Sequence, residues 1–249
     1  MFTYAIIYLK EATVAVKEKY MFKIETHIHT AEVSACSRIK AKEMVKKYHA
    51  AGYSTIFITD HFQENSLDVL GDLPWNEKMT VFLSGYYRAK FEGDKLGITV
   101  LPGAEMKFAD SKNHYLVYGI TKEFLDTYPN IHEKTLTEFS KIAKENGIFV
   151  VQAHPHRDGA CFPTPEYVDA IEVYNSNPRH VDHSELSEAL VKELGIPVTV
   201  GSDAHRDEDV AGAALVSEKE IKTVDEFILA VKSGALKIEK KPYIPTSEE

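Results

Sequence analysis

The chain has 249 residues, of which 44% are hydrophobic and 27% charged, proportions that exclude collagen-like, disordered and disulfide-scaffold classes. Its formal charge of −9, from 29 Lys and Arg against 38 Asp and Glu, disfavours stable binding to nucleic acid, whose phosphates are held by basic patches. No run reaches the roughly 18 apolar residues of a membrane helix and the start lacks a secretory signal pattern, so with two widely separated cysteines we expect a cytoplasmic protein that binds no membrane.

From Phe22 onward, short apolar runs alternate with amphipathic stretches, which is the pattern of repeated strand–helix units. Seven strands are predicted, near residues 22–26, 55–59, 98–104, 114–118, 148–153, 170–174 and 197–201. Between them the apolar spacing becomes helical, as at Ala41, Met44, Val45 and Tyr48. No linker-like change of composition interrupts this alternation, so we expect residues 21–249 to form a single α/β domain with a parallel sheet or barrel.

Three segments depart from the repeat. Residues 61–76 and 157–166 contain glycine and proline and are predicted to be long loops, which in compact domains often act as lids or binding loops. Residues 1–20 precede the first strand as an N-terminal extension. Two interpretations of this extension stay open: an added strand and helix, or an upstream segment preceding a true start at Met21.

Side chains of the types that bind divalent cations follow the predicted strands. His27 and His29 end the first strand, and because side chains alternate across a strand, both can reach one cation. The other residues of this kind at strand ends are Asp60, His61, Glu105, His154, Asp203 and His205, and His114 opens a strand. Since active sites of strand–helix barrels collect at the C-terminal edge of the strands, this distribution predicts a metal site there.

Some of these positions have a second interpretation. Asp60 can cap the turn that follows its strand, and it can also orient a ligating histidine. His156 shares a face with His154 only if the strand continues through Pro155, so His154 is the first choice as a ligand. His49 and His132 lie in helical stretches among charged residues, and we expect both on the solvated surface.

The motifs, taken together and in this order, resemble those of the PHP (polymerase and histidinol phosphatase) superfamily. They are His27-x-His29, Thr59-Asp60-His61, Glu105, His114, His154-Pro155 and Gly201-Ser202-Asp203-Ala204-His205. The segment 223–227 also resembles the closing helix of the family. The resemblance implies a distorted (β/α)7 TIM-like barrel that holds two or three divalent metal ions at the C-terminal edge of its strands.

The resemblance also implies which residues bind each ion. His27, His29, Glu105 and Asp203 would hold the first ion, Glu105, His114 and His154 the second, and His61 and His205 the third. Histidinol phosphatases and similar trinuclear members carry a further histidine shortly after the H-x-H pair, where this chain has none between Ala31 and Ser37. Either Glu32 or Cys36 replaces this histidine, or the third metal site is weak or empty. The missing histidine also weakens the assignment of histidinol phosphate as the substrate.

The chemistry that follows is hydrolysis. Cations sharing Glu105 would lower the pKa of a bridging water and so generate a metal-bound hydroxide, which predicts a phosphoesterase acting on a small phosphorylated metabolite. Arg157 is the first choice for a phosphate clamp, since a guanidinium fits phosphate bidentately. Arg38, Arg179 and His156 are further candidates for substrate contacts. Asp60 or His205 could pass a proton to the leaving oxygen.

Two other functions stay open. A metal-bound hydroxide also attacks C–N and ester bonds, so an amidohydrolase-type reaction on the same centre is the alternative. The third hypothesis is a noncatalytic metal-binding regulatory module. The complete set of candidate metal ligands argues against it. Zn, Mn and Fe all suit mixed imidazole and carboxylate ligands, so the native metal is left open.

Overall fold

The computed structural model describes residues 21–159 and 161–241, and the extension of residues 1–20 lies outside them. In this part of the chain one ten-stranded sheet runs in the order β10-β9-β1-β2-β4-β5-β6-β7-β8, with β3 attached to β4. The strands are β1 (Phe22–Glu25), β2 (Tyr53–Ile58), β3 (His61–Phe62), β4 (Thr99–Met106), β5 (Tyr115–Tyr118), β6 (Phe149–Gln152), β7 (Ala170–Asn175), β8 (Val198–Gly201), β9 (Ala213–Ser217) and β10 (Lys237–Lys240). All seven predicted strands are present.

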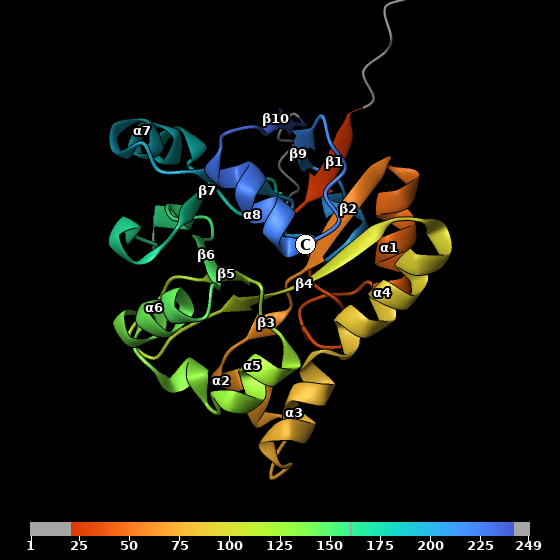
Figure 1. Cartoon of the computed structure of the whole chain (residues 1–249), viewed down its shortest axis with the longest axis vertical. Helices are drawn as coiled ribbons and strands as arrows, with labels where there is room; N and C mark the ends of the chain where they lie inside the picture. The colour runs from red at the N-terminus through yellow and green to blue at the C-terminus, as the bar shows by residue number, and fades with distance from the viewer. Residues whose placement is uncertain (1–20, 160, 242–249) are drawn as a thin grey trace, which may run out of the picture.

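The sheet curls into a nearly closed barrel (Figure 1). Strands β1, β2 and β4 are parallel neighbours, and so are β6, β7 and β8. Just beyond the ends of β1 and β8, Ile28 and Ala204 form an isolated parallel bridge that brings the two sides together. Strands β9 and β10 extend the sheet from β1 with antiparallel pairing. The prediction of a distorted TIM-like barrel is confirmed.

Strand β5 runs antiparallel to both of its neighbours, β4 and β6, unlike the parallel arrangement expected from the alternation. Its connection to β4 consists only of residues 107–114 and contains no helix, whereas a parallel crossover needs a dozen or more residues. The reversal has a consequence for the site. It places the beginning of β5, where His114 lies, at the same edge as the ends of the parallel strands.

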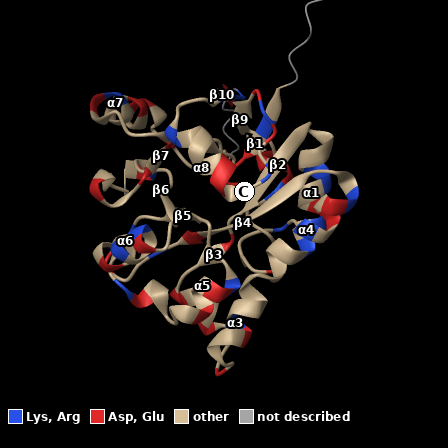
Figure 2. Cartoon of the chain, viewed as in Figure 1, with Lys and Arg blue, Asp and Glu red and all other residues tan. Residues whose placement is uncertain are grey.

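Helices cover the outside of the sheet and one end of the barrel (Figure 1). They are α1 (Ala41–Ala50), α2 (Glu64–Asp68), α3 (Trp75–Phe82), α4 (Ser84–Leu96), α5 (Lys122–Thr127), α6 (Leu136–Glu145), α7 (Ser184–Leu194) and α8 (Val224–Lys232). The predicted apolar face of α1 is buried, as expected. Figure 2 shows acidic and basic residues interspersed along α1, α4 and α6. Within the described ranges, no helix combines the length and apolar character that a membrane crossing requires.

Residues 61–76 are not the long loop that was predicted. They contain β3, α2 and the beginning of α3. Phe62 pairs with Met106 of β4, and Leu67 packs into the same apolar cluster, so these short elements form through tertiary contacts that have no periodic signal in the sequence. Residues 157–166, apart from the undescribed residue 160, contain only single 3-10 turns and agree with the predicted loop.

His132 is buried, so the prediction that it lies on the solvated surface is wrong. It belongs to the 3-10 turn Ile131–Glu133 and is only 8% exposed. Its ring is parallel to that of Trp75 in α3, with centroids 6.1 Å apart, and Phe62 packs edge-on against it. His49 is exposed on α1, as expected.

Helix α8 closes the barrel at the end opposite the predicted ligands. Thr223 and Glu226 form a capping box at its start, which agrees with the closing helix predicted at residues 223–227. Phe227 is completely buried, and its ring centroid lies 4.6 Å from that of Phe57 in β2 and 5.2 Å from that of Tyr118 in β5. This helix therefore fills the barrel interior with an aromatic plug.

Substitution of Phe227 tests how much this aromatic packing contributes to the stability of the barrel. We expect Phe227→Ala to lower the free energy of unfolding by about 3–5 kcal/mol, because a large cavity would open in the core. Urea denaturation followed by circular dichroism measures this loss. Leu229→Ala on the same helix is the control, since Leu229 is 70% exposed and its truncation should change stability by less than about 0.5 kcal/mol. Equal effects of the two substitutions would show that Phe227 does not support the barrel.

Candidate metal centre

The strand ends bring all eight predicted metal ligands to one edge of the barrel. Three groups of their donor atoms converge, and within each group the atoms lie within 4.8 Å of one another. The groups are His27–His29–Asp203, His61–Glu105–His114 and His29–His61–His205. The eighth residue, His154, has its Nε2 3.1 Å from Glu105 Oε1 and so adjoins the second group.

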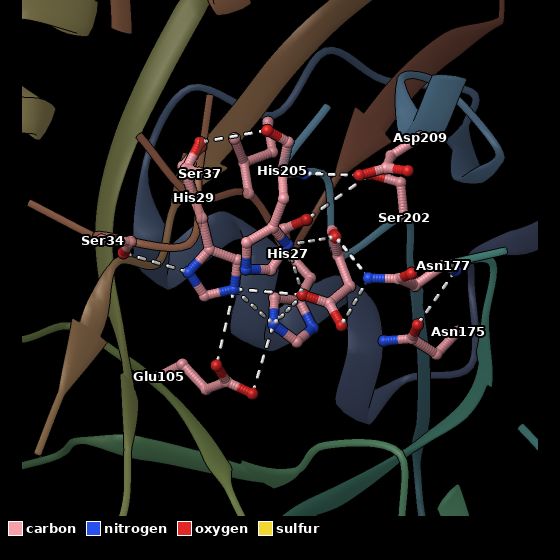
Figure 3. Close-up of polar contacts among 12 residues, drawn as sticks. His27, His29, Ser34, Ser37, Glu105, Asn175, Asn177, Ser202, His205 and Asp209 are labelled. Atoms are coloured by element: carbon pink, nitrogen blue, oxygen red, sulfur yellow. Dashed lines mark hydrogen bonds and ion pairs between the residues drawn. The ribbon is translucent and has the colours of Figure 1, made fainter. Parts of the chain in front are cut away.

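The first group is completely buried at the end of β1. The Nε2 atoms of His27 and His29 are 3.1 Å apart, and both rings point toward Glu105 (Figure 3). Asp203 Oδ1 lies 3.1 Å from His29 Nε2 and 3.4 Å from His27 Nε2. Two imidazole nitrogens that face each other share at most one proton, whereas a cation satisfies both lone pairs and the carboxylate at once.

Glu105 joins the first group to the second. Its Oε1 lies 3.1 Å from both His114 Nδ1 and His154 Nε2, and 3.4 Å from His27 Nε2. Its Oε2 lies 2.7 Å from His61 Nδ1 but is a buried atom without a hydrogen-bond partner in the described residues. Burial would raise the pKa of Glu105, but the surrounding histidines outweigh burial and hold it well below its usual range. The donor set therefore fits divalent cations that share this carboxylate.

Two of the predicted ligands lie on strained backbone. His154 has φ of 30° and Asp203 has φ of 52°, values that side-chain-bearing residues rarely adopt. Each lies two residues beyond the end of a strand, β6 or β8, where the chain turns out of the sheet. Such strain persists where the surrounding contacts fix the conformation, and it is common at functional sites.

Glu172 of β7 holds His27 in position, a role that the sequence reasoning missed. Glu172 Oε1 is 3.0 Å from His27 Nδ1, and its Oε2 accepts a hydrogen bond from the backbone N–H of His154 at 3.0 Å. A Cβ atom at Gly201 would lie only 2.5 Å from Glu172 Oε1, so glycine leaves room for this carboxylate. The available signal was a glutamate within the apolar strand predicted at residues 170–174.

Asp60 organises the loop that carries His29. It accepts hydrogen bonds from Thr30 N, Thr30 Oγ1 and Ser34 Oγ at 2.6–2.7 Å. Because Ser34 donates its proton to Asp60, the 3.4 Å contact between His29 Nδ1 and Ser34 Oγ requires His29 to donate. His29 Nε2 then keeps its lone pair toward the first group. Burial raises the pKa of Asp60 to about 6, although hydrogen bonds from Thr30 and Ser34 oppose this shift.

His205 and Cys36 lie together at the outer side of the centre. His205 Nδ1 is 2.8 Å from the backbone carbonyl oxygen of Asp203, so it donates there, and Nε2 is the ring nitrogen available to a cation. The side chains of His205 and His61 lie near the Cys36 thiol. Burial alone would raise the pKa of this thiol, but the two histidines lower it to about 6.

Glu32, the other predicted substitute for the missing histidine, is engaged elsewhere. Its Oε2 accepts a hydrogen bond from the backbone N–H of Ala41 at 2.8 Å and so caps the start of α1. Of the two substitutes, therefore, Cys36 is the one that lies near the predicted ligands His61 and His205.

The candidate substrate-binding arginines differ in their surroundings. Arg157 donates to Asp203 Oδ2 at 2.6 Å, and its Nε is buried without a hydrogen-bond partner among the described residues. Arg179 instead forms a two-point ion pair with Asp209 at 2.6 and 2.7 Å. Asp209 also accepts from the backbone N–H of His205 at 2.8 Å, so Arg179 stabilises the loop that carries this ligand.

The two remaining candidate contacts lie at the periphery of the centre. Arg38 has an exposed side chain, and its backbone N–H donates to the carbonyl oxygen of His205 at 2.8 Å. His156 is half-buried, and its Nε2 has no hydrogen-bond partner within residues 21–159 and 161–241. Burial and the nearby His183 lower the pKa of His156.

Substitution of Glu172 tests the support of His27. We expect Glu172→Gln to weaken binding of the tightest cation by about 10–100-fold, because loss of a carboxylate behind a ligating imidazole has effects of this size. Calorimetric titration of the metal-free protein with Mn²⁺ or Zn²⁺ measures the dissociation constant. Glu166→Gln replaces an exposed carboxylate before the same strand and should leave this constant unchanged. Unaltered affinity in both variants would contradict the role of Glu172.

The buried carboxyl group of Glu25 should make the stability of the protein depend on pH. Its Oε1 accepts backbone hydrogen bonds from Thr26, His27 and Ser202 at 2.9–3.0 Å, while Oε2 is buried without a partner in the described chain. Burial raises its pKa from 4.5 to about 7, although the backbone hydrogen bonds oppose this shift. The folded protein then binds more protons than the unfolded chain, so stability falls as pH rises through this window.

We therefore expect the free energy of unfolding of the wild type to fall by about 3 kcal/mol between pH 4.5 and 7.5, relative to that of Glu25→Gln. The glutamine cannot ionise at this position. The measurement is urea denaturation of both proteins in the presence of a chelator, so that cation binding does not contribute. Parallel pH profiles of the two proteins would show that Glu25 is already ionised in the folded state.

The comparisons with known proteins agree with this geometry. Residues 25–186 match the family model described as PHP domain, and residues 182–236 match the one described as PHP-associated. No curated protein matches the chain in sequence.

Several solved structures share the fold. A Bacteroides vulgatus two-domain protein containing a predicted PHP-like metal-dependent phosphoesterase is 16% identical, with a TM-score of 0.65 over 89% of this chain and 65% of that one. PsfC from Pseudomonas syringae is 17% identical, with a TM-score of 0.62 over 89% and 92% of the two chains. The lesion-specific endonuclease PfuEndoQ from Pyrococcus furiosus is 16% identical, with a TM-score of 0.60 over 88% and 58%.

At these identities the structural likeness shows the fold alone. This chain spans 65% of the Bacteroides protein and 58% of PfuEndoQ, but most of PsfC. The PHP model, in contrast, matches well over half of the chain and includes six of the eight predicted ligands. The chain therefore belongs to the PHP domain family.

Proposed function

We propose that this protein is a metal-dependent phosphoesterase that releases phosphate from a small phosphorylated metabolite. Members of the PHP family are metal-dependent hydrolases. The observation that carries the proposal is the position of Glu105, whose two oxygens face donors of two adjoining groups. Divalent cations bound there would activate water as a nucleophile and offset the charge of the phosphoryl oxygens.

We assign the ligands as the donor groups suggest. His27, His29, Asp203 and Glu105 would hold the first cation, and Glu105, His114 and His154 the second. His61 and His205 would contribute to a third. The second group is the open side of the centre, since His114 is 25% exposed and His61 15%, whereas His27 and His29 are fully buried. Substrate and water would therefore enter from the side of His114 and His61.

Arg157 is the residue that favours a phosphate ester over a neutral substrate. Its guanidinium is held beside the first group by Asp203, and its buried Nε–H has no partner in the described residues. A phosphoryl oxygen placed against the centre would satisfy that donor, since guanidinium groups pair strongly with phosphate. A neutral amide or ester would leave this buried positive charge without additional compensation. We therefore place phosphoester hydrolysis ahead of amidohydrolase-type chemistry.

The two candidates for proton transfer take positioning roles in this proposal. Both oxygens of Asp60 accept hydrogen bonds from Thr30 and Ser34, so this carboxylate acts on His29 through Ser34. His205 has its Nδ1–H directed to a backbone carbonyl oxygen, which fixes the ring and leaves Nε2 as the nitrogen that would bind a cation.

Inorganic phosphate release by the Mn²⁺-reconstituted protein tests the reaction class. The substrates are histidinol phosphate, sugar phosphates, nucleotides, a chromogenic phosphate monoester, an oligonucleotide and an N-acyl amide. We expect chelator-sensitive phosphate release from at least one small monoester. Cleavage of the oligonucleotide or the amide alone, by protein confirmed to contain its metals, would overturn the proposal.

Substitution of a first-group ligand tests whether this centre performs the reaction. We expect Asp203→Ala to reduce turnover by at least about 100-fold, because it removes the carboxylate that lies beside both His27 and His29 and would bind the same cation. The circular dichroism spectrum should be retained. Asp207→Ala is the matched control, since this carboxylate lies four residues further along, is exposed and forms a surface ion pair with Lys47. Near wild-type turnover of Asp203→Ala would show that the first group is not catalytic.

A further inference from the structure

A cavity of about 410 Å³ lies directly beyond two of the predicted ligands. Strands β3 and β4 pair in parallel with His61 opposite Glu105, and the ladder continues where Lys107 N donates to the carbonyl oxygen of Phe62 at 3.3 Å. Side chains alternate along extended chain, so Gln63 lies on the face of His61, about 7 Å further along. Lys107 has the same relation to Glu105. Both residues line the cavity, which therefore begins beside the open side of the metal centre.

His132 forms a wall of this cavity. Its ring stacks on Trp75, whose indole N–H donates to the carbonyl oxygen of Leu125 at 2.7 Å, so the stack is fixed to α5. His132 is 8% exposed, and its Nδ1 is buried without a hydrogen-bond partner within residues 21–159 and 161–241. Burial lowers the pKa of His132, so the ring is neutral at pH 7 and has one donor and one acceptor nitrogen. Leaving such a group unpaired costs free energy, which a hydrogen bond to a bound ligand would recover.

The lining of the cavity carries balanced charge and both kinds of hydrogen-bonding group. It contains two lysines, two glutamates and two amides, which are Lys107, Lys112, Glu64, Glu133, Gln63 and Asn65. A second phosphate or a carboxylate on the substrate would meet the glutamates, and an ammonium group would meet the lysines. An apolar group would displace water from these side chains without replacing its hydrogen bonds. Hydroxyl groups both donate and accept, so a polyhydroxylated group fits this lining best.

We propose that this cavity binds the alcohol part of the phosphate ester and that this part is polyhydroxylated, as in a sugar phosphate. The phosphoryl group lies on the metal centre in this arrangement, and the sugar extends past His61 to His132, which is a specificity-determining residue. The volume is within the range of roughly 300–1,000 Å³ that small-molecule cavities occupy. This inference rests on the proposed function, because it names the substrate class of the same centre.

A matched set of phosphate monoesters tests the substrate class. The Mn²⁺-reconstituted protein is given glucose 6-phosphate, fructose 6-phosphate, ribose 5-phosphate, hexyl phosphate, pentyl phosphate and 3-phosphoglycerate. We expect the best sugar phosphate to exceed the alkyl phosphate of equal carbon number by at least about tenfold in kcat/KM, because a site built for hydroxyl groups rejects analogues that lack them. If an alkyl phosphate or the carboxylate-bearing ester is hydrolysed as efficiently as the best sugar phosphate, the proposal is wrong.

Substitution of His132 tests its role in this preference. His132→Phe keeps an aromatic ring against Trp75 but removes both nitrogens, so the fold should be retained. We expect kcat/KM for the best sugar phosphate to fall about five- to tenfold, mainly through KM, because one hydrogen bond to the sugar is lost. Hydrolysis of hexyl phosphate should stay unchanged. A second variant, Asn65→Ala, removes an exposed amide of the lining and should lower the same preference.

The control for these variants is His49→Phe, at an exposed histidine of α1, which should leave the hydrolysis of both substrates unchanged. An undiminished preference for sugar phosphates in both His132→Phe and Asn65→Ala would show that the cavity does not select the substrate.

Binding of phosphonate analogues separates this inference from the proposed function. Calorimetric titration of the metal-loaded protein with the phosphonate analogues of glucose 6-phosphate, ribose 5-phosphate and hexyl phosphate does not depend on turnover. Tighter binding of a sugar phosphonate without hydrolysis of any ester would contradict the proposed function and support the assignment of the cavity. Hydrolysis without a preference for sugar phosphates would support the function and contradict the assignment. Equal binding of all three analogues would also contradict it.

Discussion

The structure depends on burying one carboxylate, Glu105, among imidazole rings at the open end of a barrel. A buried carboxylate is costly unless positive charge or hydrogen-bond donors surround it. Here histidines from four different strand ends surround it, and each comes within 3.5 Å of one of its oxygens. No local segment could supply them all. The closure of the sheet and the reversed direction of β5 are therefore conditions for the centre to exist.

A layer of carboxylates outside the ligands fixes their orientation. Glu172 faces His27, Asp60 acts on His29 through Ser34, and Asp209 holds the backbone of His205. Each has backbone or hydroxyl donors of its own, so its charge is compensated where it lies. The ring nitrogens of these histidines are thereby directed toward the centre. This preorganisation lowers the cost of assembling the site when a cation binds.

The sequence predicted the seven strands and the convergence of the candidate ligands at one edge, because both depend on local pattern: an apolar run followed by His, Asp or Glu. It could not predict features that depend on contacts distant in the chain. The direction of β5 follows from the short connection 107–114, and the short elements within 61–76 form only by packing against β4. His132 is buried by Trp75, and Glu172 reaches His27 only because Gly201, on a third strand, leaves space.

The two ends of the barrel divide stability and chemistry between them. The ligand end is filled with polar side chains, several on strained backbone, and contributes little apolar burial. The opposite end is filled by Phe57, Tyr118 and Phe149 packed around Phe227 of α8. Charged groups collected at one site destabilise a fold unless packing elsewhere compensates. The apolar packing at the aromatic end therefore offsets the cost of the charged side chains at the ligand end. The segment that matches the PHP-associated model contains α8 as well as Asp203 and His205, so it contributes to both ends of the barrel.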